Sequence, residues 1–399
     1  MAETANDQFF DAMVRHQVYL LRYSGTVRNK LVKMLNDSEP AMVEKIRSRM
    51  DGTVRLTTEA QWRKFRKALN EVIVVRNDAW ASVQREFEAE LIALAEEEPK
   101  FIIGFLAAAV AVLLNMKSPP KAELNAIVKR QMTLGRTLTQ WVENMRQSDV
   151  QRISAQLQAG VTQGDGPTAL ARRVVGTAAV GGSNGATEIT RRNVAAVVPT
   201  VVTNVVNAAR ALTLGQKGAP VQRERFTAVL DHRTTILCAS LDGSVYPIGV
   251  GPIPPLHVRC RSLRIAVIAA NLMANEPLKP KVERQLIREF AEANSLVGVK
   301  SRTDLLRGAQ KDFDAYVRKR LELLTGKANL PANYQEWLKR QSPKFQELVL
   351  GKAKAKLFRD GNLALKEFVD YGGQEMTLSQ LSAIHREAFV AAGLDPDKY

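Results

Sequence analysis

Apolar side chains recur at helical spacing through most of the first 160 residues, and this periodicity constrains the fold more than any other feature. Two such sets are Phe9, Met13, Val18 and Leu21, and Trp62, Phe65, Leu69 and Val72. Spacings near three and four residues place side chains on one side of an α-helix. We therefore expect a mainly α chain with long N-terminal helices and a small α+β domain further along.

Helix boundaries in this region are predicted by turn formers and prolines. Thr57-Thr58 marks a helix start after the Asp51-Gly52 turn, and Glu96-Glu97-Glu98-Pro99 is expected to end a long helix. Ser118-Pro119-Pro120 is expected to open the next one.

The run Phe101–Leu114 contains 14 residues without a charge. It is shorter than the roughly 18–20 residues that a membrane-spanning helix needs. It therefore predicts a buried helix and no stable membrane span. The first residues lack the layout of a signal peptide, which predicts synthesis in a reducing cytoplasm.

Breaks and changes in residue pattern along the sequence predict four regions. Gly164-Asp165-Gly166-Pro167 is a strong break, so residues 1–160 are expected to form a helical N-terminal domain. Residues 161–270 are expected to form an α+β domain, in which a helical run from Thr187 to Leu214 is kinked or split at Pro199. Residues 271–330 form a predicted helical connector. Residues 331–399 form a predicted small helical C-terminal region, with helix starts near Pro331, Pro343 and Thr377.

Three short runs inside residues 161–270 read as strands. They are Phe226–Leu230, Ser244–Ile248 and Arg261–Val267. Their β-branched or alternating residues are separated by glycine and proline, which favours a small antiparallel sheet.

The net charge is +16, and the excess is spread along the chain. Residues 1–160 carry 23 basic and 19 acidic side chains (+4), residues 161–260 carry 10 and 5 (+5), and residues 261–399 carry 24 and 17 (+7). A diffuse positive charge favours non-specific contact with a polyanion such as DNA. The alternative is a solvated surface that only keeps the protein soluble.

Both cysteines and two of the four histidines lie between residues 228 and 264. His257 and Cys260 have the spacing of a metal-ligand pair, and Cys238 or His232 could complete a tetrahedral zinc site. Two further interpretations stay open for the cysteines. They are small buried side chains without a function, or they form a disulfide, which a reducing compartment disfavours.

Asp231 and Arg233, followed by the turn signal Asp242-Gly243, also allow two interpretations. As structure, Asp231 and Arg233 tie down a loop between two strands. As chemistry, Asp231, His232 and His257 would suggest a metal-dependent nuclease in which one group activates water.

A polar stripe follows Pro199 on an otherwise apolar helix. Its members are Thr200, Thr203, Asn204 and Asn207, which share one helical face. The stripe is either the solvated side of the helix or it faces the Cys/His loop and hydrogen-bonds the irregular backbone there.

The order and spacing of these residues resemble the signature of the Mu F-type head morphogenesis family, the minor head proteins of tailed bacteriophages. The matching pattern is Asp231-x-Arg233-Thr234-x3-Cys238-x2-Leu241-Asp242-Gly243, then Pro254-Pro255-x-His257-x2-Cys260-Arg261. The resemblance covers residues ~161 to ~268. Thr235 and Ser262 stand where some members carry further cysteines, so a four-cysteine site is not expected.

The resemblance implies a minor head (capsid) protein made in the host cytoplasm and incorporated into the virion, inside the head near the portal. It implies action in head morphogenesis and in genome packaging or ejection. The implied partners are the portal protein, the scaffold or major capsid protein and, non-specifically, the packaged DNA. The resemblance implies no catalytic activity. The alternative is a metal-dependent nuclease or effector ejected with the DNA.

Overall fold

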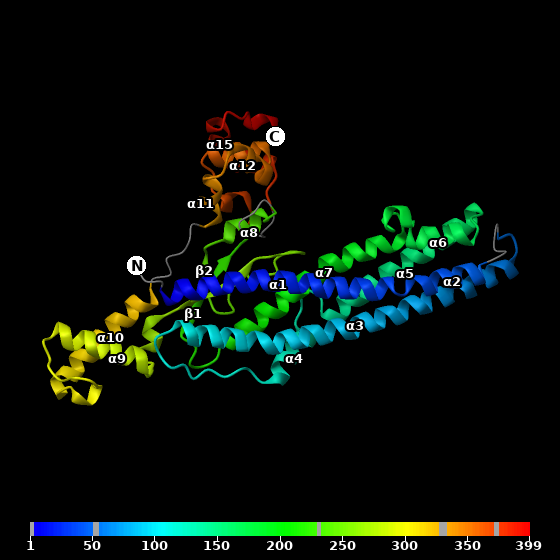
Figure 1. Ribbon diagram of the computed structural model, residues 1–399. Helices are drawn as coiled ribbons and strands as arrows, with labels where there is room; N and C mark the ends of the chain where they lie inside the picture. The colour runs from blue at the N-terminus through cyan, green and yellow to red at the C-terminus, as the bar shows by residue number, and fades with distance from the viewer. Residues whose placement is uncertain (1–3, 51–55, 230–232, 327–332, 371–374) are drawn as a thin grey trace.

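The computed structural model describes residues 4–50, 56–229, 233–326, 333–370 and 375–399. It is mainly α-helical with one small antiparallel sheet, as predicted. A long helical body runs across Figure 1, the sheet lies at one end of it, and two smaller helical units project from that end.

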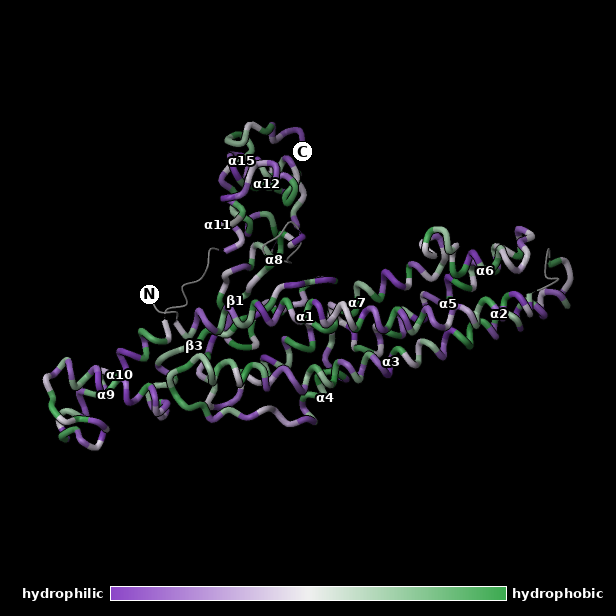
Figure 2. The backbone as a smooth tube through the Cα atoms, in the orientation of Figure 1, coloured by the Kyte–Doolittle hydropathy of each residue, from purple (hydrophilic) through white to green (hydrophobic). Residues whose placement is uncertain are grey.

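Long helices form the body. They are α1 (Ala5–Asn36), α2 (Glu39–Arg49), α3 (Glu59–Ala109), α4 (Lys121–Arg130), α5 (Leu138–Gln163), α6 (Pro167–Val175) and α7 (Ala186–Leu214). The 51 residues of α3 span about 75 Å at 1.5 Å per residue. Apolar and polar stretches alternate along α1 and α3 in Figure 2, as expected of helices that bury one face.

Threonines start three of these helices. Thr4, Thr58 and Thr137 each accept a hydrogen bond from the backbone at the third helical position, and the side chain at that position bonds back. Such capping boxes satisfy N–H groups that the helix leaves without partners. The predicted helix start at Thr57-Thr58 is confirmed.

The predicted helix end at Pro99 is wrong, because α3 continues through this residue to Ala109. Glu98 is buried between helices and forms ion pairs with His16 of α1, at 2.7 Å, and with Arg210 of α7. Packing on both neighbours therefore holds the helical path that proline alone would disfavour.

The apolar run Phe101–Leu114 is only partly helical and only partly buried, so the predicted buried helix is partly wrong. Phe105 and Leu113 are exposed, whereas Ile102, Leu106, Val110 and Val112 are buried. After Ala109 the chain becomes extended, and Val112 forms an isolated antiparallel bridge with Leu278. Among the described residues, one helix is long and apolar enough to cross a membrane, namely Thr187–Leu214, and 72% of its apolar window is buried inside the protein. This helix, α7, is unbroken at Pro199, so of the two expected alternatives, a kink or a split, the split is wrong.

The sheet contains β1 (Val221–Thr227), β2 (Val245–Pro247) and β3 (Leu263–Ile268) in the order β2-β1-β3. Both pairings are antiparallel, with Glu224 opposite Tyr246 on one side and opposite Ala266 on the other. The strands predicted at Ser244–Ile248 and Arg261–Val267 are therefore confirmed as β2 and β3. The first is misplaced, because β1 runs over Val221–Thr227 and shares only Phe226 and Thr227 with the predicted Phe226–Leu230.

Short helices form the remaining units. They are α8 (Ile236–Leu241), α9 (Pro280–Ala293), α10 (Arg307–Thr325), α11 (Tyr334–Lys339), α12 (Pro343–Leu350), α13 (Lys352–Arg359), α14 (Leu378–Ile384) and α15 (Arg386–Ala391), with 3₁₀ turns η1 (Ala178–Val180), η2 (Ala270–Met273), η3 (Arg302–Asp304), η4 (Leu365–Phe368) and η5 (Pro396–Lys398). The C-terminal helices begin at Tyr334, Pro343 and Leu378, close to the predicted starts.

Two hydrophobic cores each contain residues from more than one of the four regions predicted from the sequence. Residues 194–209 of α7 share the core of the body with α1, α3, α4 and α5, and the expected boundary at 160 falls inside α5. A second core joins Cys238 and Cys260 to the C-terminal helices, including Tyr334 and Phe389. The Cys/His loop thus lies where three parts of the chain meet.

Candidate metal centre

Two separate turns bring the cysteines together. The Thr235 hydroxyl accepts a hydrogen bond from the Cys238 backbone N–H and caps α8, which places Cys238 in the first turn of that helix. The other turn precedes β3 and is closed by the Cys260 N–H, which donates to the His257 carbonyl at 3.1 Å. Both cysteines are buried, and His257 is partly exposed.

The three side chains form one compact ligand set. The Sγ atoms of Cys238 and Cys260 lie 3.7 Å apart, and His257 Nε2 lies 3.3 Å from Cys238 Sγ. All three ligand atoms lie within 4.8 Å of one another. Two thiolates on one tetrahedral zinc ion, with bonds of about 2.3 Å, would lie about 3.8 Å apart. The group could therefore hold a metal ion, and both thiols are free here, without a disulfide.

The orientation of His257 fits this role. Its Nδ1 lies 3.0 Å from the Val258 carbonyl oxygen, which places the ring proton on Nδ1. Nε2 then lies 3.0 Å from the Thr235 hydroxyl and 3.3 Å from Cys238 Sγ, where its lone pair would be available to a metal ion. Metal-binding histidines commonly donate their second ring N–H to a carbonyl in this way.

The local electrostatics favour one thiolate. A hydrogen bond from the Cys238 thiol, aided by His257, lowers the pKa of Cys260 to about 4. The same hydrogen bond, together with burial, raises the pKa of Cys238. The bond to Cys260 also raises the pKa of His257. A thiolate is the form of cysteine that binds metals.

The proposed fourth ligand lies outside the described residues. His232 and Asp231, which the sequence analysis placed in the site, belong to the segment 230–232. Within the part of the chain that the structure describes, the set has three metal-binding side chains, Cys238, His257 and Cys260.

Asp242 joins the sheet to the C-terminal helices. Its carboxylate accepts hydrogen bonds from the Ala228 N–H at 2.7 Å and from the Tyr334 N–H at 2.6 Å. Burial raises the pKa of Asp242 above its usual range. Gly243 has a φ of 84°, and a Cβ there would lie 3.2 Å from the Asn333 side chain. The Asp242-Gly243 turn therefore has a structural role.

The other motif residues surround the same loop. The Thr234 hydroxyl donates to the Val229 carbonyl, and Arg233 is exposed. Arg261 is half-buried, and its carbonyl accepts a hydrogen bond from Gln17 of α1 at 3.3 Å. The expected contact between Asp231 and Arg233 involves a residue outside the described segments.

The polar stripe of α7 faces the Cys/His loop, which is the second of the two expected arrangements. Asn207 donates to the Pro254 carbonyl at 2.9 Å, and the Thr200 hydroxyl accepts from the Arg259 N–H at 2.8 Å. The Thr203 hydroxyl is 3.5 Å from the Cys260 carbonyl. All four stripe residues are buried, including Asn204. The stripe thus supplies hydrogen bonds to backbone that forms no sheet or helix.

A buried ion pair beneath this loop was not predicted from the sequence. Arg264 of β3 lies 3.2 Å from Glu224 of β1 and donates to carbonyls of the loop at Val250 and Pro252. The sequence offered one signal, which is that Arg264 is a charged residue inside an otherwise apolar strand. Glu224 was hidden because the predicted strand began only at Phe226.

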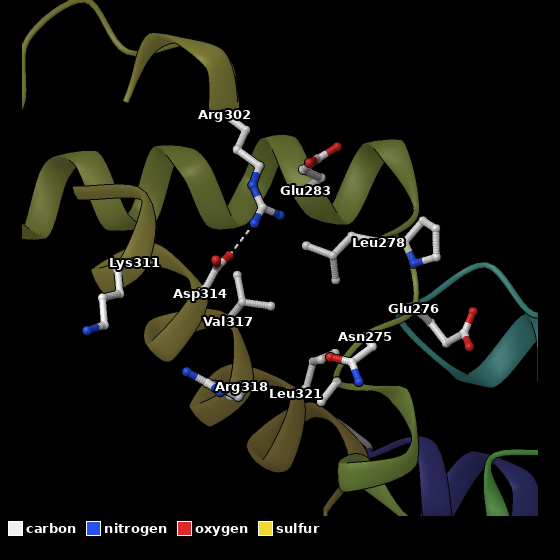
Figure 3. Close-up of a pocket in the computed structure, with 12 residues that line it drawn as sticks. Asn275, Glu276, Leu278, Glu283, Arg302, Lys311, Asp314, Val317, Arg318 and Leu321 are labelled. Carbon is white, nitrogen blue, oxygen red and sulfur yellow. Dashed lines mark hydrogen bonds and ion pairs between the residues drawn. The ribbon is translucent and has the colours of Figure 1, made fainter. Parts of the chain in front are cut away.

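A separate pocket of about 600 Å³ lies between α9 and α10, away from the motif. Figure 3 shows the ion pair of Arg302 with Asp314 in it, together with Glu283, Lys311 and Arg318. Acidic and basic side chains alternate around it, so its lining favours no single charge of ligand.

The chain was compared with protein families, curated proteins and solved structures, and none of the three comparisons finds a match.

Proposed function

We propose that this chain is a minor head protein of a tailed bacteriophage, bound at the portal and acting in head morphogenesis and in genome packaging or ejection. One observation carries the proposal. Residues of the family-like signature that are far apart in sequence, Cys238, His257 and Cys260, meet within 4.8 Å. Residues that match a family signature by chance have no reason to lie close together in the fold. The contact between these three side chains therefore supports the resemblance.

This cluster also supports a structural zinc ion as the cofactor. Thiolate and imidazole ligands in a tetrahedral arrangement are typical of zinc. Such an ion would cross-link α8 to the turn before β3 and so stabilise the fold. Metal analysis of the reduced, purified protein should give about one zinc per chain. Protein without zinc after growth in zinc-rich medium would disprove this part of the proposal.

The position of the cluster fits a structural role. Both cysteines belong to the hydrophobic core that holds the C-terminal helices, and Asp242 bonds the first of these helices at Tyr334. A metal there would fix the C-terminal unit on the sheet. The long helical body would then remain available for contacts with portal, scaffold or major capsid protein, and the net charge of +16 suits packaged DNA.

The assembly role is tested in infected cells. We expect the protein to co-purify with the portal protein from procapsids. We also expect heads assembled without it to be defective in shape, DNA content or infectivity. Normal heads on all three measures would contradict the proposal.

A second candidate, a metal-dependent nuclease ejected with the DNA, is favoured by one observation. Within the described residues the set offers three ligands, and His257 is partly exposed, so a water molecule could take a fourth position, as in catalytic zinc sites. Plasmid cleavage with Zn²⁺, Mg²⁺ or Mn²⁺ that His257→Ala abolishes would support it. The absence of cleavage with each of these metals would exclude it.

A further inference from the structure

A further pocket, of about 400 Å³, lies between α1 and the sheet. Its walls are almost entirely apolar, in contrast to the charged pocket between α9 and α10. Apolar pockets of this size that contain a few polar groups are typical binding sites. The side chains that line it include Phe10, Val14, Val18 and Leu21 of α1 and Thr227 and Leu263 of the sheet.

Helical spacing and strand alternation together form the walls of this pocket. Its four residues from α1 follow one another at intervals of four, four and three positions, so they share one face of the helix. Thr227 of β1 lies opposite Leu263 of β3 in the antiparallel pairing. Arg225 precedes Thr227 by two positions and therefore points to the same side of the sheet. Its guanidinium lies 5.7 Å from the centre of the Phe10 ring, which places this side of the sheet against α1.

Thr227 contributes a polar atom to the apolar wall. The residue is buried, and its hydroxyl has no hydrogen-bond partner among the described residues. Nearly all buried polar atoms in folded proteins have a partner, because a buried hydroxyl without one is costly. A group that entered the pocket and bonded this hydroxyl would remove that cost. The Thr227 hydroxyl therefore indicates an occupant that carries a hydrogen-bonding atom.

The two charged side chains in the lining, Arg225 and Asp242, oppose each other. The negative charge of Asp242 acts on the Arg225 guanidinium. The Asp242 carboxylate also accepts hydrogen bonds from the Ala228 and Tyr334 N–H groups. The lining therefore offers no net charge to an ion, and the hydrogen-bonding atom of the occupant is expected to be neutral.

Exposed apolar side chains continue from the pocket onto the surface of α1. Val14 is 37% exposed and Val18 is 45% exposed, although both line the pocket. A small molecule inside the pocket would leave much of these side chains in water. A protein segment that lies along α1 would cover them and also fill the pocket. Exposed apolar surface that adjoins a pocket therefore favours a protein partner.

We propose that this pocket receives a tyrosine or tryptophan side chain of a partner protein, whose O–H or N–H group donates to the Thr227 hydroxyl. These side chains combine a large apolar ring with one neutral polar atom, and they are enriched among the residues that dominate protein interfaces. A leucine would leave the hydroxyl without a partner, and a charged side chain would meet both Arg225 and Asp242. The contact requires neither the metal centre nor the proposed role in head assembly.

The test uses the purified full chain and capped amino acids, which carry one side chain on a neutral backbone. N-acetyltyrosinamide and N-acetylphenylalaninamide differ only in the phenolic hydroxyl. Their affinities are measured by titration with saturation-transfer NMR. The tyrosine probe should bind about fivefold more tightly than the phenylalanine probe, as expected for one net hydrogen bond. Equal affinities, or no binding of the tyrosine probe, would overturn the proposal.

Thr227→Val is the decisive variant. Valine has nearly the same shape as threonine and also favours strands, and it removes the buried hydroxyl, so the variant should fold at least as well as the wild type. The affinity for the tyrosine probe should fall about fivefold, and the two probes should then bind equally. A preference for tyrosine that persists in Thr227→Val would contradict the assigned contact.

Val18→Gln tests the mouth of the pocket. It should weaken binding of the tyrosine probe about threefold, because part of the apolar contact is lost. Val74→Gln is the matched control, since Val74 is a similarly exposed valine, at 48%, on α3 and outside the lining. It should keep the wild-type affinity. A similar affinity in both variants would show that the probe binds elsewhere.

p-Cresol, which is the tyrosine side chain without a backbone, separates a docking site from a small-molecule site. If the pocket receives a side chain of a partner protein, the capped tyrosine should bind at least as tightly as p-cresol, because its backbone lies outside the mouth. Binding of p-cresol without binding of the capped tyrosine would assign the pocket to a small molecule and reject a protein partner.

Discussion

Asn207 of α7 donates a hydrogen bond of 2.9 Å to the carbonyl oxygen of Pro254, 47 residues later in the chain. Both groups are buried. The bond ties the long helical body to the loop that carries His257 and Cys260. It therefore connects the helical part of the molecule to the candidate metal centre.

Asn207→Ala should destabilise the protein by about 1–3 kcal/mol, because it leaves the buried Pro254 carbonyl without this donor. Urea denaturation measures the free energy of unfolding. Asn204→Ala is the control, since Asn204 is buried on the same stripe but makes no hydrogen bond to the described residues of the loop. Equal losses in the two variants would show that the bond itself contributes little.

Removal of the metal should loosen the candidate centre. If zinc is bound at 100 times its dissociation constant, it stabilises the folded state by about 2.7 kcal/mol. A strong chelator should then lower the Tm of the wild-type protein by about 3 °C. The double variant Cys238→Ser/Cys260→Ser should contain no zinc, and the chelator should not change its Tm. An equal chelator effect on both proteins would place the metal elsewhere.

Glu98→Gln should be strongly destabilising, because it leaves the buried Arg210 without its charged partner. Breaking a buried ion pair on one side costs about 3–5 kcal/mol. Glu97→Gln is a close control, since Glu97 is exposed and forms an ion pair with the exposed Lys100 at 2.5 Å. Its effect should stay below about 1 kcal/mol. Similar unfolding energies for both variants would contradict the structural importance of Glu98.

The Glu98 carboxylate should also make the free energy of unfolding depend on pH in the acid range. Burial alone would raise the pKa of Glu98, but Arg210 and His16 together lower it below its usual value. A carboxyl group with a lowered pKa in the folded state stabilises the protein above its unfolded pKa of about 4.3, and this contribution is lost as the pH falls further. The free energy of unfolding should fall more steeply below pH 4.5 in the wild type than in Glu98→Gln. Parallel pH profiles would show that another group dominates.

Asp242→Asn should loosen the C-terminal helices while leaving the helical body intact. The new amide has one oxygen for the two backbone donors at Ala228 and Tyr334, so one of these N–H groups loses its acceptor. Hydrogen exchange should become faster in α11–α15 and stay unchanged in α3. Uniformly faster exchange over the whole chain would instead indicate a global loss of stability.

Much of this fold is encoded locally. Helical periodicity located the long N-terminal helices, and Thr57-Thr58 located the start of α3, because both signals act between residues a few positions apart. The three short strands were also recognisable from β-branched residues between glycines and prolines. The spacing of His257 and Cys260 marked them as a ligand pair, with Cys238 or His232 as a further candidate.

The remaining features depend on contacts between distant segments, which no local pattern encodes. Pro99 reads as a helix end, yet Glu98 is held by His16 and Arg210 from two other helices, and the helix continues. The polar stripe of α7 could have faced water, and only the packing of the loop against the helix turned it into a set of buried hydrogen-bond partners.

The sequence by itself determined that this protein is mainly helical and roughly where its small sheet lies, and it named Cys238, His257, Cys260 and His232 as candidate ligands. The tertiary structure decided that Cys238 Sγ and Cys260 Sγ lie 3.7 Å apart and that their core is shared with the C-terminal helices. The physical reason is that secondary structure follows from local periodicity, whereas a ligand set depends on long-range packing. Here two cysteines 22 residues apart are brought together because α7, the sheet and the C-terminal helices all pack against the two turns that carry them.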